Sequence, residues 1–277
     1  MKIHSLYRDF FKFEQKISSN SDKWRVYSTH YYKPHREFLE EYFSHFPLID
    51  ELSLKERVER IKKSDYSWLK HLVSVCPPEK IITDAYNRCK SIISLQEEPE
   101  VYLLVGFFSP DGFVMDFQNK PVIGFGLERF RDFRLLRILF AHEYAHYVLN
   151  STSGEVPQDK KWKWLLVSEG IGTYFSRLVF PGHKLENHFL FSRATLNWCK
   201  ANEAYLKEIF CSGRYSQPKL IDFYFKGSGE LGLPARAGKF LGFQAVGEYV
   251  KETGDIEKLM TDKNSALSLK LEASPKP

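Results

Sequence analysis

Two histidines and a glutamate interrupt an otherwise apolar stretch, ILFAHEYAHYVLN, at residues 138–150. His142 and His146 are four residues apart, so on an α-helix they share one face, with Cβ atoms about 5–6 Å apart. Neutral imidazoles are ligands for Zn²⁺, and a catalytic zinc site takes three protein ligands and leaves a fourth position for water. Glu143 follows the first histidine and is placed to take a proton from that water. The spacing therefore predicts a hydrolytic zinc site of the HExxH type.

A chance match to this short pattern must be weighed against the prediction. In a chain with nine histidines we expect such a match at roughly two per cent. The surroundings of the motif favour a real site, because burying three polar groups in an apolar helix is costly unless something binds them. A metal ion would do so.

A third polar group lies further along the chain in KWLLVSEGIGTYF, where Glu169 is set among apolar residues. The segment directly after His146 has no glycine at the third position and no histidine at the sixth, which excludes the metzincin pattern. A charged partner explains Glu169 better than the alternative of an ordinary, partly exposed acid. Gly170 and Gly172 would let this helix approach the HExxH helix closely.

HExxH followed by a glutamate in a second helix is similar to the gluzincin group of zinc metallopeptidases. More narrowly, the segments LFAHEYAHYVL, VSEGIGTYF and ARAGKFLGFQAVGEYV resemble a family of predicted bacterial zinc-dependent proteases described as a domain of unknown function. The resemblance covers about residues 101–252. It implies that His142, His146 and Glu169 bind Zn²⁺ and that Glu143 is the general base.

Peptide hydrolysis at such a site needs a further donor for the oxyanion. Arg236 is the favoured candidate because it precedes the third motif, and plain packing is the alternative for it and for the other candidates, Tyr174, His188, Tyr215 and Tyr249. Thr173 is a weaker candidate for orienting a histidine. The third motif departs from the family pattern, because Lys239 and Phe240 follow Gly238 where we expect a Gly-Tyr pair.

The segment PVIGFGLE, just before the HExxH helix, is a candidate edge strand that pairs with an extended peptide. Gly124 and Gly126 would leave room for that peptide, or alternatively mark a bulge or a tight bend. Glu128 could bind a substrate N-terminus, although a solvated acid at a strand end is the default interpretation.

The elements that must position these residues follow from periodicity. Residues 1–98 alternate aromatic and charged residues at helical spacing, whereas VYLLVGFF, GFVMDFQ and PVIGFGLE predict a small, mostly antiparallel sheet. Residues 130–150, 160–180, 185–210 and 233–254 each predict a helix, the last stopping at Gly254. We expect an α+β fold, zincin-like by resemblance, with a helical region (1–98), a metallopeptidase domain (99–260) and a C-terminal tail (261–277) whose last residues, EASPKP, fray.

Composition limits the classes of function. The 277 residues are 43% hydrophobic, enough for a packed core, and the net charge of +5 is spread along the chain, so a nucleic-acid partner is not indicated. No stretch has signal-peptide character and none approaches the roughly 18 apolar residues that span a bilayer, so we expect a cytoplasmic protein without membrane contact. The four cysteines form no CxxC pair and are expected to be reduced thiols.

The predicted function is zinc-dependent hydrolysis of peptide bonds in a peptide or protein substrate. The alternative is a catalytically silent, zinc-bearing scaffold that binds a peptide or protein. The intact Glu143 argues against the scaffold, which has no need of a general base. The sequence indicates no oligomeric state.

Overall fold

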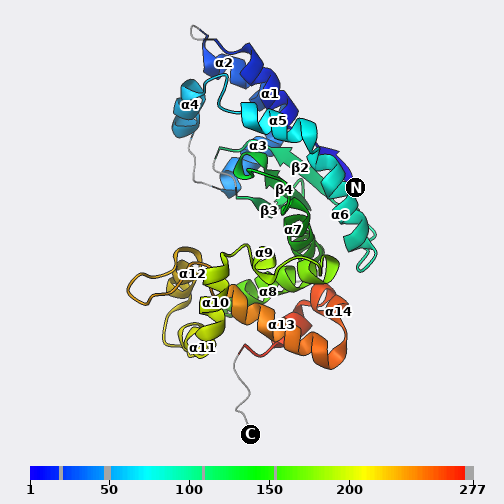
Figure 1. Ribbon diagram of the computed structural model, residues 1–277, viewed down its shortest axis with the longest axis vertical. Coiled ribbons are helices and arrows are strands. Elements are labelled where there is room, and N and C mark those ends of the chain that lie inside the picture. Colours follow the sequence, from blue (N-terminus) through cyan, green and yellow to red (C-terminus); the bar gives the residue numbers. More distant parts are fainter. Residues whose placement is uncertain (19–20, 47–50, 108–109, 153–154, 272–277) are drawn as a thin grey trace. The chain divides into compact units, whose positions relative to one another are not determined.

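The computed structural model describes residues 1–18, 21–46, 51–107, 110–152 and 155–271. The chain forms two compact units, a first unit of Met1–Asn87 with Ser94–Glu143 and a second unit of Arg88–Ile93 with Tyr144–Pro277. The division falls within two continuous helices, α6 (Pro78–Lys90) and α7 (Leu136–Ser151) (Figure 1). The domain boundaries predicted at residues 98 and 260 divide the chain at other points, and they stay a prediction. The frayed end expected at residues 272–277 lies outside the described residues.

The first unit contains a four-stranded sheet in the order β1-β2-β4-β3. Its strands are β1 (Lys2–His4), β2 (Glu100–Leu104), β3 (Gly112–Phe117) and β4 (Lys120–Gly126). The pairings β1–β2 and β2–β4 are parallel and only β3–β4 is antiparallel. The sheet is therefore mixed, and the prediction of a mostly antiparallel sheet is wrong. It failed because the three-residue β1 is too short to show a period, and because β4 inserts between β2 and β3.

Strands β3 and β4 form a tight hairpin whose position changes the predicted site for a peptide. Gln118 and Asn119 both have positive φ, 51° and 62°, as a two-residue type I′ turn requires. Because β4 is paired on both sides, the prediction that this segment is an edge strand is wrong. Gly124 leaves room for a neighbouring ring instead of a peptide, since a Cβ there would lie 2.1 Å from Cζ of Phe113.

The first unit also contains several helices, as the periodicity of residues 1–98 predicts. Besides α6 they are α1 (Tyr7–Lys16), α2 (Lys23–Tyr27), a π-helical turn (Ser28–Tyr32), a 3₁₀ turn (Lys33–His35), α3 (Arg36–His45), α4 (Glu51–Arg60), α5 (Ser67–Val75) and a further 3₁₀ turn (Leu127–Arg129). Aromatic rings join them to the sheet: Phe38 stacks on Tyr102 with ring centroids 3.9 Å apart. The buried Tyr31 hydroxyl donates to the Val105 carbonyl and accepts from its N–H.

The second unit is helical in its described part. After the end of α7 come a 3₁₀ turn (Gln158–Lys160), α8 (Lys161–Val179), α9 (Leu185–Phe189), α10 (Arg193–Ala201), α11 (Glu203–Cys211), α12 (Gln217–Lys226), α13 (Lys239–Thr253), α14 (Ile256–Thr261) and α15 (Lys263–Ser268). Helix α13 ends at Gly254, whose φ of 73° gives the left-handed cap that the sequence predicts. No helix in the described ranges is long and apolar enough to cross a lipid bilayer.

Residues 185–210, predicted as one helix, form three. Leu190 ends α9 in the left-handed conformation, with φ 56°. Ser192 then caps α10 by accepting the Thr195 N–H, and Asn202 separates α10 from α11. The apolar period continues through these breaks, which is why periodicity alone missed them.

Helices α8 and α13 lie side by side in the second unit and touch through their backbones (Figure 1). A Cβ on Gly170 would lie 2.2 Å from the carbonyl carbon of Gly242, and one on Gly242 would lie 1.8 Å from the Leu166 carbonyl oxygen. Gly170 therefore serves the approach of α13, whereas we expected it to serve the approach of the HExxH helix. This crossing brings the first turn of α13 beside Glu169.

Candidate metal centre

Helix α7 carries the HExxH residues on a nearly fully buried segment. All residues from Phe140 to Leu149 are buried except His146, whose side chain is 18% exposed. His142 and Glu143 are 4% and 7% exposed. A helix that is apolar on every face is stabilised by burial, so the polar residues within it need partners of their own.

Three side chains converge at this helix. His142, His146 and Glu169 each offer one ligand atom, and these atoms lie within 4.8 Å of one another. His146 Nε2 lies 3.7 Å from Glu169 Oε1. Ligands about 2.0–2.1 Å from a tetrahedral zinc ion lie roughly 3.4 Å apart, so a small adjustment would complete the site. Two imidazoles and one carboxylate fit zinc.

The charge state of His146 also suits a metal ligand. Burial lowers the pKa of His146, the positive charge of Lys239 lowers it further, and the carboxylate of Glu169 opposes both effects. A histidine with a lowered pKa is neutral near pH 7, the form in which imidazole binds a metal.

The Glu169 carboxylate forms an ion pair with a buried cation. Lys239 Nζ, on the first residue of α13, lies 3.1 Å from Glu169 Oε2, and the lysine side chain is only 2% exposed. Tyr224, on α12, faces the same carboxylate: burial, and then the charge of Glu169, raise the pKa of its phenol well above the usual value. Oε2 of Glu169 is therefore directed at Lys239, while Oε1 is directed at His146.

Glu143 lies against the start of β3 in the first unit. A Cβ on Gly112 would lie 2.9 Å from Cγ and 3.0 Å from Oε1 of Glu143. The absence of a side chain at Gly112 therefore leaves the space that the Glu143 carboxylate occupies.

Residues 112–268, more than half of the chain, match the model of a family described as predicted Zn-dependent protease (DUF2268). This range contains the three converging side chains as well as Glu143, Gly112 and Lys239. The chain belongs to this family. No curated protein and no solved structure matches it.

In this member of the family of predicted Zn-dependent proteases, the other predicted site residues have different surroundings. Arg236 is exposed and has a φ of 61°. Its backbone N–H donates to the Tyr224 carbonyl, so it lies beside Tyr224. Thr173 donates to the backbone carbonyl of Glu169. His188 Nδ1 is 3.0 Å from the hydroxyl of Ser176, and Glu128 accepts the Gly106 N–H.

Two of the three tyrosine candidates show ring contacts, and the third is partly buried. Tyr174 packs on Phe243 and Tyr215 on Phe223, with ring centroids 5.8 and 5.2 Å apart. Tyr249 is half-buried on α13.

Sequence reasoning missed Lys239 and Tyr224 as neighbours of Glu169. A signal for Lys239 was present, because this lysine stands in the apolar run AGKFLGF at the third motif. A lysine among apolar residues at the start of a helix predicts a buried cation that needs a partner. Tyr224 carries no comparable signal.

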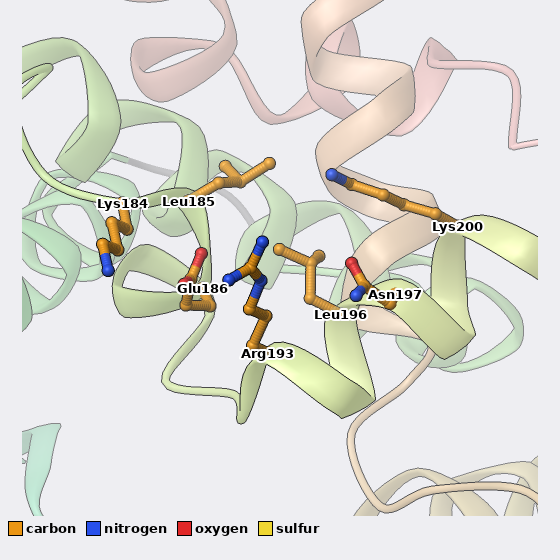
Figure 2. A pocket seen from close by; sticks show the side chains of 7 residues that line it. All are labelled: Lys184, Leu185, Glu186, Arg193, Leu196, Asn197 and Lys200. Atoms are coloured by element: carbon orange, nitrogen blue, oxygen red, sulfur yellow. The ribbon is translucent and has the colours of Figure 1, made fainter.

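A pocket elsewhere in the second unit differs in its chemistry. It has a volume of about 350 Å³ and is lined by residues of α9 and α10 with the residue before α9: Lys184, Leu185, Glu186, Arg193, Leu196, Asn197 and Lys200 (Figure 2). The Lys184, Arg193 and Lys200 side chains belong to exposed residues, and the lining includes neither histidine nor cysteine. It lacks the buried donor set of the cluster on α7 and α8.

Proposed function

We propose that this protein is a zinc-dependent peptidase of the gluzincin type, in which His142, His146 and Glu169 hold the metal and Glu143 is the general base. The observation that carries the proposal is the convergence of the three ligand atoms within 4.8 Å. The match of the surrounding residues to the family of predicted Zn-dependent proteases supports the same chemistry.

Each side chain has a separate task in this proposal. A bound zinc ion supplies a Lewis acid for the scissile carbonyl and lowers the pKa of water. Glu143 takes the proton from the attacking water and delivers it to the leaving amine. Its place against Gly112 limits where its carboxylate can lie, which supports a fixed direction of proton transfer. Arg236, whose backbone N–H donates to the Tyr224 carbonyl, is the proposed donor to the oxyanion.

The proposed substrate is an extended peptide segment that pairs with β3. In the described chain β3 pairs only with β4, so its other edge presents backbone groups that can bind a peptide strand. Because Gly112 at the start of β3 lies beside Glu143, a peptide on this edge would pass close to the general base.

Metal content tests the proposal. Protein purified without chelator or added zinc should contain about one zinc per chain by elemental analysis, and His146→Ala should lose it. His71→Ala is a matched control, because His71 is exposed on α5 and outside the cluster. Folded wild-type protein that neither contains nor takes up zinc would overturn the proposal. Stoichiometric zinc without hydrolysis of any peptide in a broad panel would favour a binding scaffold.

A further inference from the structure

Lys239 is the only fully buried lysine in the part of the chain that the structure describes, at 2% exposure. Lysines are almost never fully buried unless they are paired. Its partner is Glu169, with Nζ 3.1 Å from Oε2. A buried cation therefore contacts the residue proposed as the third metal ligand.

The helix crossing forces this contact. Lys239 begins α13, and Gly242, one turn later, touches the backbone of α8 at Leu166. Gly238, just before the helix, lies where a Cβ would be 2.8 Å from Leu166 Cδ2 and 3.1 Å from Phe210 Cε2. Lys239 lies between these two close contacts with α8, and its ammonium pairs with the carboxylate of Glu169.

The two oxygens of Glu169 have different neighbours. Oε2 faces Lys239 and Oε1 faces His146. The lysine side chain is 2% exposed whereas that of Glu169 is 24% exposed, so the ammonium lies behind the carboxylate as seen from solvent. Lys239 is thus less accessible to a substrate than Glu169, and its ion pair with Glu169 is the contact through which we expect it to act on the site.

We propose that Lys239 is a positioning residue and the internal counter-ion of the metal site, an inference that rests on the proposed function. In the metal-free protein its ammonium neutralises Glu169 and keeps Oε1 turned toward the histidines. When a divalent cation binds, the same ammonium repels it, so Lys239 weakens metal binding while it stabilises the metal-free fold. A site with this residue keeps its shape without metal and binds metal less tightly than a site with a neutral residue there.

The test compares zinc affinity and thermal stability in wild type, Lys239→Met and Lys239→Arg. Zinc Kd is measured by competition with a chromophoric chelator, and unfolding is followed with excess chelator and with saturating zinc. Lys239→Met should bind zinc at least about tenfold more tightly. Its Tm should fall by several degrees in chelator, and zinc should restore most of that loss. Lys239→Arg, which keeps the charge, should stay within about threefold of the wild-type Kd.

Lys251→Met is the matched control, because Lys251 is exposed on the same helix. It should change neither quantity. An unchanged or weaker zinc affinity in Lys239→Met, with the same loss of Tm in chelator and in zinc, would overturn the counter-ion role. Failure of wild-type protein to bind zinc would overturn the proposed function as well, so the two failures are distinguishable.

A double-mutant cycle tests the pairing of Lys239 with Glu169 even if one of the single variants folds poorly. Glu169→Gln leaves the buried ammonium without its carboxylate, and Lys239→Met leaves the carboxylate without its ammonium. In chelator, the double variant should be more stable than the sum of the two single losses predicts. Additive losses would contradict the pairing.

Discussion

At the scale of single residues, the HExxH segment separates ligands from base. His142 and His146 belong to the converging ligand atoms, whereas Glu143 does not and lies against Gly112 instead. Adjacent residues on a helix point in directions about 100° apart, so this separation follows from the spacing itself.

Glu143→Gln should therefore keep zinc and lose hydrolysis. The amide retains the size of the carboxylate but cannot accept a proton, and loss of a general base typically costs about 10²- to 10⁴-fold in rate. The measurement is kcat on a cleaved peptide beside zinc content by elemental analysis. Glu230→Gln, at an exposed position outside the site, is the control. Full activity of the Glu143 variant would contradict the mechanism.

At the scale of elements, two glycines set the approach of neighbouring segments. Gly112 opens β3 beside α7 and lets the Glu143 carboxylate fit against the strand. Gly242 lets α13 reach the backbone of α8, which brings Lys239 to Glu169. The site depends on these contacts as much as on its ligands.

Gly112→Ala should reduce kcat by about tenfold or more while zinc content is unchanged. The new Cβ would lie 2.9 Å from Glu143 Cγ, so the base must shift while the ligands stay in place. Gly229→Ala is the control, because a Cβ there meets nothing within 4 Å. Loss of zinc together with activity would show that Gly112 supports the whole site and not the base alone.

Gly242→Ala should lower the free energy of unfolding by at least about 1–3 kcal/mol, because its Cβ would overlap the backbone of α8. Gly247→Ala is the matched control on the same helix, where the nearest atom is the Tyr174 ring at 3.6 Å. That substitution should be neutral or stabilising, by up to about 1 kcal/mol. Denaturant unfolding of the two variants decides the point, and equal losses would contradict the close approach.

At the scale of the whole molecule, buried histidines make stability depend on pH. His188 is 1% exposed, and burial, followed by the positive charges of His183 and Arg177, lowers its pKa to about 4. In the unfolded chain a histidine has a pKa of about 6.5. The folded protein therefore holds His188 neutral in a range where the unfolded chain binds a proton.

Stability from His188 is fully present above about pH 6.5 and is lost as the pH falls toward 4, by up to about 3 kcal/mol. Below pH 4 the loss levels off, since both states are protonated. Denaturant unfolding of metal-free protein at several pH values should show this slope. His188→Gln should flatten the slope and His71→Gln should not. An unchanged slope in His188→Gln would contradict the assignment.

The sequence by itself determined the helices and strands whose residue spacing repeats over a short segment. The four-residue spacing of His142 and His146 predicts one helical face, and the apolar periods of residues 130–150 and 160–180 predict α7 and α8, which the structure confirms. The three β-rich runs after residue 100 likewise appear as β2, β3 and β4. These predictions succeed because helix and strand periods repeat within a few residues.

Only the tertiary structure decided how those elements meet. The insertion of β4 between β2 and β3, the contact of Glu143 with Gly112, and the pairing of Lys239 with Glu169 all join residues that are distant in sequence. Lys239 stands out in its segment as a cation in need of a partner, but the partner is chosen by the point at which α13 crosses α8. That point depends on backbone contact between Gly170 and Gly242, which a one-dimensional period does not encode.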